Sequence, residues 1–123
     1  MELYKKDEYY KIIGICMEVH RILGGGLSEI VYKDALQYEF IKNEIPFERE
    51  KEFKIRYKDI YLPHNFYADF VLYDEIILEI KTASEIGAEH IAQTLNYINL
   101  SYNKLGIIAN FKNKSLQHQR VIV

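Results

Sequence analysis

The chain has 123 residues, of which 49% are hydrophobic and 28% are charged, with a formal net charge of −2 and one cysteine. These values exclude a disordered chain, a membrane-spanning chain and a disulfide-stapled scaffold, and they predict one globular domain, residues 1–123. The first eight residues contain no apolar signal core, and the lone Cys16 suits a reducing compartment, so we expect a cytoplasmic protein with no membrane contact.

The charge is unevenly distributed. Residues 90–123 contain four basic residues and no Asp or Glu, whereas the first 89 residues have a net charge of −6. Such asymmetry is typical of a surface that faces a polyanion, and a chance distribution of solvated lysines explains it equally well. Eleven tyrosines could provide stacking surfaces for bases or could be ordinary core and surface residues.

Two helices are predicted at the start of the chain, over residues 7–23 and 28–43, because apolar residues recur there at helical spacing. The three glycines at 24–26 end the first helix, and Pro46 prevents continuation of the second. The expected apolar residues of the first helix are Tyr10, Ile12, Ile13, Cys16, Met17, Val19, His20 and Leu23.

Strands and a third helix are predicted in the remainder of the chain. The residue patterns predict strands over 47–57, 66–72, 76–81, 105–111 and 117–123, and a helix over 85–102 with Tyr102 on its apolar face. The order α-α-β-β-β-α-β-β predicts an α/β fold in which a mixed sheet is flanked by helices.

The strands over 66–72 and 76–81 are expected to form a hairpin that brings two carboxylates together. If residues 73–75 form the loop, Leu72 faces Ile76 and Asp69 falls opposite Glu79. Residues opposed in this way have Cβ atoms roughly 4.5–5.5 Å apart.

Two carboxylates this close repel each other unless a cation lies between them, and a divalent metal is the natural candidate. Lys81 points to the same face as Glu79, where it could orient water or neutralise charge on phosphorus. Glu29 lies at the start of the second helix and Gln93 lies on the third, and both are candidate members of the site.

These residues resemble a known nuclease motif. Asp69 followed by Glu79-Ile80-Lys81 is similar to the core motif of the PD-(D/E)XK nuclease superfamily, and the segment 26–32 matches Gly-x-x-Glu-x-x-Tyr, the signature of the small GxxExxY proteins placed in that superfamily. Further matches are Val19-His20, Glu50-Lys51, Gln93 to Tyr97 and Gly106 to Phe111. Ala68 replaces the proline that names the superfamily, and three glycines precede the signature where the family has two around a proline or similar residue.

The resemblance implies a restriction-endonuclease-like fold and a site that binds Mg²⁺ or Mn²⁺. By this resemblance Glu29, Asp69 and Glu79 are metal ligands, Lys81 is catalytic and Gln93 lines the site. The implied function is hydrolysis of phosphodiester bonds in DNA, or in RNA. Homodimerisation is compatible with this function, because enzymes that cut a duplex need two sites.

Several alternatives stay open at this stage. Glu79 and Lys81 could form a structural ion pair, Glu29 could stabilise only its helix start, and Gln93 could satisfy backbone groups. The whole domain could be a non-catalytic nucleic-acid-binding or protein-interaction module, or a metal-dependent phosphohydrolase that acts on nucleotides.

Overall fold

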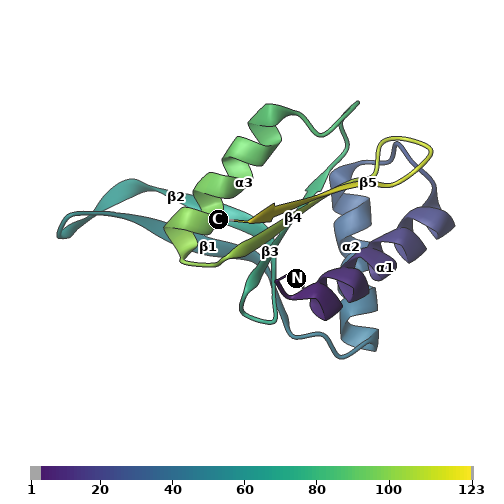
Figure 1. Cartoon of the computed structure of the whole chain (residues 1–123), viewed down its shortest axis with the longest axis horizontal. Coiled ribbons are helices and arrows are strands. Elements are labelled where there is room, and N and C mark those ends of the chain that lie inside the picture. The colour runs from purple at the N-terminus through teal and green to yellow at the C-terminus, as the bar shows by residue number, and fades with distance from the viewer. Residues whose placement is uncertain (1–3, 123) are drawn as a thin grey trace.

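The computed structural model describes residues 4–122, which form three helices and five strands (Figure 1). The elements are α1 (Lys6–Leu23), α2 (Glu29–Lys42), β1 (Phe47–Tyr57), β2 (Ile60–Leu72), β3 (Ile76–Lys81), α3 (Ala88–Ser101), β4 (Leu105–Asn110) and β5 (Gln117–Ile122). The predicted α/β class and element order are confirmed. Of the predicted last strand, Val123 lies outside the described residues.

The five strands form one mixed sheet in the order β1-β2-β3-β4-β5. β3 and β4 run parallel and α3 connects them, because a parallel pair requires a crossover, while the other neighbours are antiparallel. β3 lies in the middle of the sheet and is covered on both faces. This double covering explains the nearly continuous apolar run in its sequence.

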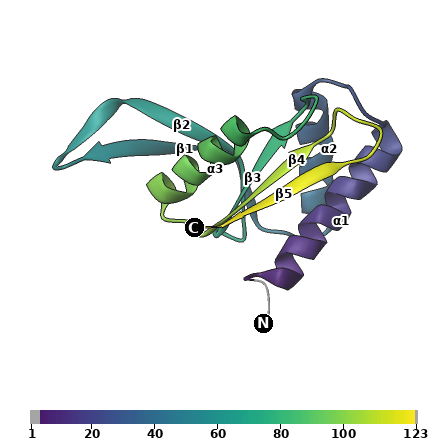
Figure 2. The same ribbon diagram turned by 45° about the horizontal axis from the view of Figure 1, so that its top comes forward.

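The β1–β2 hairpin extends well beyond the rest of the sheet (Figures 1 and 2). β2 pairs with β3 only over residues 70–72, so residues 51–68, the hairpin arm, form a ribbon of two strands. A ribbon of two strands is marginally stable in water. A stack of three aromatic rings joins the hairpin arm to α3. The ring centroid of Phe53 lies 5.0 Å from that of Phe66, which lies 4.4 Å from that of Tyr97.

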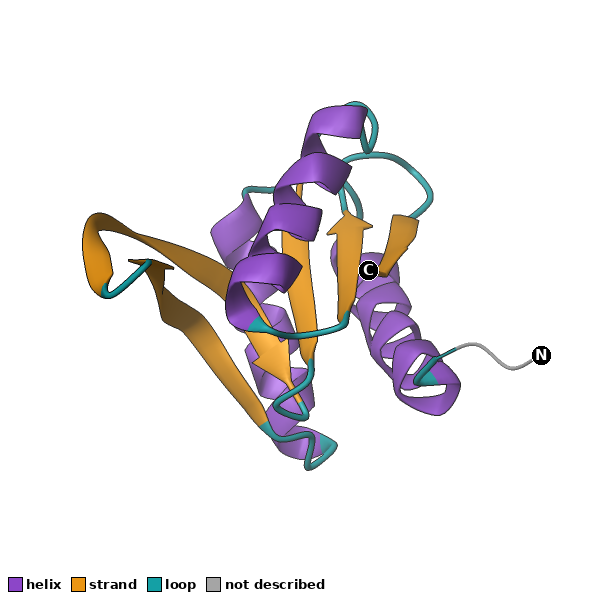
Figure 3. Ribbon diagram, turned by 60° about the vertical axis from the view of Figure 1, so that its left-hand side comes forward, coloured by secondary structure: helices purple, strands orange, loops and turns teal. Residues whose placement is uncertain are grey.

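The helices form a layer on each face of the sheet (Figure 3). α1 and α2 cover one face and enclose the larger apolar cluster, which includes Phe40, Phe70 and Ile80. α3 covers the other face over a smaller cluster that includes Ile77, Ile98 and Ile108. Among the described residues, no helix is long and apolar enough to cross a membrane.

Two expectations about helix faces need correction. Three residues expected on the apolar face of α1, Tyr10, Met17 and Leu23, are exposed, whereas the other five are buried. The buried residues of α1 are Tyr9, Ile12, Ile13, Ile15, Cys16, Val19 and His20. Tyr102 is 90% exposed, because α3 ends at Ser101 and Tyr102 adopts a left-handed backbone that turns it away from the core.

Gly106 sets the distance between α3 and the sheet. A Cβ atom built at this position would lie 2.6 Å from Cγ2 of Thr94 and 2.9 Å from Cδ1 of Ile98. Both contacts are shorter than packed atoms tolerate, so only glycine allows α3 to lie this close to β4. This close packing places the polar residues of α3 over the end of β3.

Candidate functional site

Asp69 and Glu79 lie together where β2 and β3 separate. The backbone N–H of Asp69 donates to Oε2 of Glu79 at 2.8 Å, and the backbone N–H of Ile80 donates to Oδ2 of Asp69, also at 2.8 Å. Each carboxylate therefore bonds to the strand that bears the other. This reciprocal bonding fixes the two acidic groups next to each other.

The predicted hairpin register accounts for this meeting. Leu72 lies opposite Ile76, as expected, and the ladder continues to Phe70 opposite Leu78. The next position belongs to Asp69 and Glu79, where carboxylates take over the hydrogen bonds that the backbone of the other strand would make. The register is confirmed, but the separation of the strands was not predicted.

Glu79 is buried in a setting that disfavours its negative charge. Its residue is only 3% exposed. Burial raises the pKa of Glu79 to about 8, the negative charge of Asp69 adds to this effect, and the Asp69 N–H and the Lys81 ammonium oppose it only in part. At neutral pH the metal-free pair therefore retains a proton. A cation at this position would compensate the charge and release that proton.

Lys33 of α2 provides a positive charge on the other side of Asp69. Its ammonium lies 2.9 Å from Oδ1 of Asp69 and also pairs with Glu50. Burial lowers the pKa of Lys33, but hydrogen bonds and attraction to Glu50 and Asp69 outweigh burial, so its pKa is raised. Lys33 is therefore a charged partner that holds one oxygen of Asp69.

Glu50 has a strained backbone at the position opposite Asp69. Its φ is +52°, in the left-handed region that residues other than glycine rarely adopt. The ladder between β1 and β2 has pairs on both sides of this position, Arg49 with Phe70 and Lys51 with Ala68. Such strain concentrates at functional sites, and here it accompanies the contact between Glu50 and Lys33.

Lys81 lies at the end of β3, beside α3. Its ammonium donates to Oε1 of Gln93 at 3.3 Å, and its charge acts on Glu79. Burial, followed by the charges of Glu79 and Asp69, raises the pKa of Tyr97, and Gln93 opposes this effect only in part. Asp69, Glu79, Lys81 and Gln93 are therefore brought together, and Tyr97 lies beside them.

Asn110 of β4 holds the loop that follows Lys81. Its Nδ2 donates to the carbonyl of Ala83 at 2.8 Å, and its Oδ1 accepts from the Ala83 N–H at 3.0 Å. The Phe111 N–H donates to the Lys81 carbonyl at 2.9 Å. Asn110 is fully buried opposite Lys81 in the parallel register, so it is a positioning residue for the end of β3.

Tyr32 organises the glycine loop that leads into α2. Its hydroxyl donates to the Gly24 carbonyl at 2.6 Å and accepts from the Leu27 N–H at 3.0 Å, and its ring stacks on Phe111 at 4.5 Å. The His20 ring contacts the carbonyl of Asn113 at 2.8 Å through its Nε2. These contacts fix the chain immediately before Glu29.

Glu29 itself is exposed in the first turn of α2. Over residues 4–122, no three His, Cys, Asp or Glu side chains lie close enough together to form a metal-binding group. The three predicted metal ligands therefore do not form one cluster, and the metal role of Glu29 stays a prediction.

The Asp69–Glu79 pair still fits a hard divalent cation. Mg²⁺ is commonly bound by one or two carboxylates and retains waters at its other positions. The pair offers carboxylate oxygens at a buried position where the neighbouring positive charge does not fully offset the cost of ionising Glu79. A bound divalent cation would stabilise the ionised carboxylates there. Asp69 and Glu79 would hold the ion.

Lys33 and Asn110 belong to the site but were missed from the sequence. Lys33 follows Glu29 by four residues, so a helical projection places both on one face of α2. Asn110 is the single amide in the apolar run 105–111. Either signal could have drawn attention to these residues.

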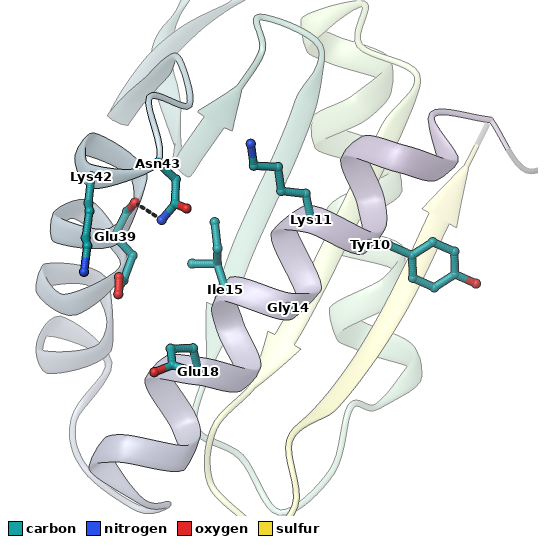
Figure 4. A pocket seen from close by; sticks show the side chains of 8 residues that line it. All are labelled: Tyr10, Lys11, Gly14, Ile15, Glu18, Glu39, Lys42 and Asn43. Carbon is teal, nitrogen blue, oxygen red and sulfur yellow. Dashed lines mark hydrogen bonds between the residues drawn. The ribbon is translucent and has the colours of Figure 1, made fainter.

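A cavity of about 350 Å³ lies away from the candidate site, between α1 and α2 (Figure 4). It is lined by Tyr10, Lys11, Gly14, Ile15, Glu18, Glu39, Lys42 and Asn43. The lining includes none of the residues of the carboxylate pair, so we assign it no part in the chemistry.

Comparisons with known proteins bear on the family and the fold. The family model described as the PD-(D/E)XK nuclease superfamily matches residues 6–121. No curated protein sequence matches the chain. The solved structure "Crystal structure of SSO0001" superposes with a TM-score of 0.61 at 19% identity, covering 76% of this chain and 50% of that one. The likeness supports the fold, and the chain spans about half the length of that protein.

Proposed function

Because this chain belongs to the PD-(D/E)XK nuclease superfamily, we propose that it is a Mg²⁺- or Mn²⁺-dependent nuclease that hydrolyses phosphodiester bonds in DNA, or in RNA. The observation that supports this most directly is the reciprocal bonding of Asp69 and Glu79, with the Lys81 ammonium acting on the same pair.

Each residue has a distinct chemical task in this proposal. Asp69 and Glu79 hold the cation, which when bound supplies positive charge that polarises the phosphoryl group. Lys81 neutralises the negative charge that develops on phosphorus as water attacks and the bond to the leaving oxygen breaks. Gln93 positions Lys81 through their hydrogen bond. Glu29 joins the metal ligands only if the start of α2 approaches the pair when the ion binds.

One observation favours a second candidate function, a non-catalytic nucleic-acid-binding module. Lys33 already neutralises Asp69, so the acidic group is satisfied in part by the protein itself. In that case the carboxylates and Lys33 would be a structural network, and nucleic acid would bind without being cleaved.

A panel of substrates separates these functions. Plasmid, linear duplex, single-stranded DNA, RNA and nucleotides are incubated with Mg²⁺ or Mn²⁺ and the wild-type chain, Lys81→Ala or Asp69→Ala. We expect cleavage of polynucleotide by the wild type and its loss in both variants. Binding without cleavage supports the module, turnover of nucleotides alone supports a phosphohydrolase, and cleavage that survives both substitutions contradicts this site.

We also infer that the chain is a GxxExxY protein, on the basis of Gly26, Glu29 and Tyr32. Tyr32 supports this inference because its hydroxyl holds the loop from which α2 starts. Tyr32→Phe keeps the ring and removes both hydrogen bonds. If the signature tyrosine serves the site through this loop, we expect Tyr32→Phe to lower the cleavage rate at a temperature at which the variant is still fully folded. A loss confined to stability would contradict this role.

A further inference from the structure

A basic and aromatic hollow lies between the hairpin arm and the end of α3. Its volume is about 300 Å³, and it is lined by Lys54, Arg56, Tyr61, Asn99, Leu100 and Tyr102. The lining includes two cations and no acidic side chain. Positive charge in a concave surface attracts a polyanion.

The two tyrosines of this hollow expose their rings to solvent. Tyr61 is 64% exposed and Tyr102 is 90% exposed. Exposed aromatic rings next to cations are the combination that binds single-stranded nucleic acid, because bases stack on the rings while Lys and Arg contact the phosphates. In a duplex the faces of the bases are already stacked on each other, so the rings would have less to contact.

Tyr102 occupies a backbone position that favours glycine. Its φ is +61° at the C-cap of α3, a left-handed conformation that is unfavourable for a bulky side chain. A glycine there would relieve this strain. The ring is therefore presented to solvent at a cost in folding stability.

The hollow and the carboxylate pair lie along the same helix. Gln93 contacts Lys81 in the first half of α3, and Leu100 lines the hollow two turns later. Seven residues of helix span about 10 Å, a distance that a strand of a few nucleotides covers. The Phe66–Tyr97 stack joins arm and helix between these two points.

The surface on the other side of Tyr102 has mixed charge. Tyr102 also lines a separate hollow of about 200 Å³ with Asp74 and Glu75 of the β2–β3 turn and with Lys104. Glu75 in addition pairs with Lys5 at 2.7 Å. The hollow lined by Lys54 and Arg56 contains cations and no carboxylate, so it is the electrostatically favourable one for a polyanion.

We propose that the hollow between the arm and α3 binds a single strand of nucleic acid, with bases on Tyr61 and Tyr102 and phosphates on Lys54 and Arg56. That the strand then leads to Asp69 and Glu79 rests on the proposed function; the binding itself does not.

Binding is tested with fluorescence anisotropy, using labelled oligo-dT and a duplex of the same length, in EDTA so that no cleavage occurs. We expect the single strand to bind more tightly than the duplex. Tyr102→Gly should weaken single-strand binding about tenfold, the loss of one stacking contact, while the melting temperature stays the same or rises. Weaker binding without a loss of thermal stability would show that the Tyr102 ring contacts the strand and does not act by stabilising the fold.

The charge contribution is tested with Lys54→Gln/Arg56→Gln against a matched control, Lys11→Gln/Lys42→Gln. The control removes the same charge from the α1–α2 cavity on another surface (Figure 4). We expect the first pair to flatten the log–log salt dependence of single-strand affinity by about 1.4, since each phosphate contact contributes about 0.7. The control should bind like the wild type.

Three results would overturn this inference: duplex bound as tightly as the single strand, Tyr102→Gly binding as the wild type does, or the control weakening binding as much as the arm variant. Failure of the proposed nuclease activity looks different. If the wild type binds the single strand through Tyr102 but never cleaves it, only the proposed nuclease function is contradicted. If the wild type cleaves and Lys54→Gln/Arg56→Gln and Tyr102→Gly bind the single strand as tightly as it does, only the proposed strand-binding site is contradicted.

Discussion

The two faces of the sheet differ in what they contain. The α1–α2 face encloses a large, almost wholly apolar cluster in which Phe40 and Phe70 meet edge to face at 5.2 Å. The α3 face encloses a small cluster, and at its edge lie the ionisable groups of Glu79 and Lys81. Apolar burial on one face provides the free energy that offsets the cost of burying a polar carboxyl group on the other.

Truncation of the apolar face should have the largest effect on stability. Phe40→Ala removes a fully buried ring, so we expect the free energy of unfolding to fall by about 3–5 kcal/mol. Leu95→Ala on the α3 face removes a partly buried side chain and should cost only about 1 kcal/mol. Urea unfolding measures both. Equal losses would break the contrast between the faces.

Removal of the charged group of the α3 face should instead affect chemistry. Lys81→Ala is expected to lower the rate of phosphodiester cleavage by a factor of about 100 to 1,000, because a positioned donor of charge is lost from the transition state. The free energy of unfolding should change little, since Lys81 is only partly buried. Lys11→Ala is the matched control, and a similar loss of activity in it would show a general charge effect.

The buried carboxyl of the α3 face should make metal-free stability depend on pH. The folded pKa of Glu79 is raised to about 8 from an ordinary value of 4.5. The folded state binds this proton more tightly than the unfolded state does. The resulting contribution to the free energy of unfolding is therefore fully present below about pH 4.5 and is lost as the pH rises to about 8.

Glu79→Gln removes this titration while keeping an oxygen that accepts from the Asp69 N–H. In EDTA we expect the variant to be more stable than the wild type at pH 8, by an amount on the order of a few kcal/mol, and the difference to shrink toward pH 5. Thermal unfolding across this range measures it. Parallel curves for the two proteins would show that Glu79 is not held neutral by the fold.

The close contact between α3 and β4 belongs to the α3 face, and its disruption should give a smaller effect. Gly106→Ala places a methyl group against Thr94 and Ile98, so we expect a loss of about 1–3 kcal/mol in unfolding free energy. Gly14→Ala is the matched control, because a Cβ atom there meets nothing within 4 Å. Since Gln93 lies on the displaced helix, cleavage by Gly106→Ala should also slow. An unchanged stability would mean that α3 is free to shift.

Much of this arrangement could be predicted from local patterns. Helical periodicity and the glycines gave α1 and α2 within a residue or two, and the register from Leu72 and Ile76 placed Asp69 beside Glu79. These features depend on short-range rules of turns and alternation.

The remaining features depend on tertiary packing. Lys33 reaches Asp69 because α2 packs against the sheet, and Asn110 reaches Ala83 because the loops that follow β3 and β4 meet. The exposure of Tyr102 follows from where α3 ends. No spacing in the sequence encodes these distances, so side-chain partners between elements could not be assigned.

The most direct test of the account is a calorimetric titration of Mn²⁺ into the metal-free chain at pH 7, in buffers of different ionisation enthalpy. The account predicts one bound ion, release of up to one proton from the carboxylate pair, and an affinity at least about tenfold weaker in Asp69→Asn but unchanged in the exposed control Asp59→Asn. A wild type that binds no Mn²⁺, or an Asp69→Asn variant that binds it equally well, would contradict the claim that Asp69 and Glu79 share a cation.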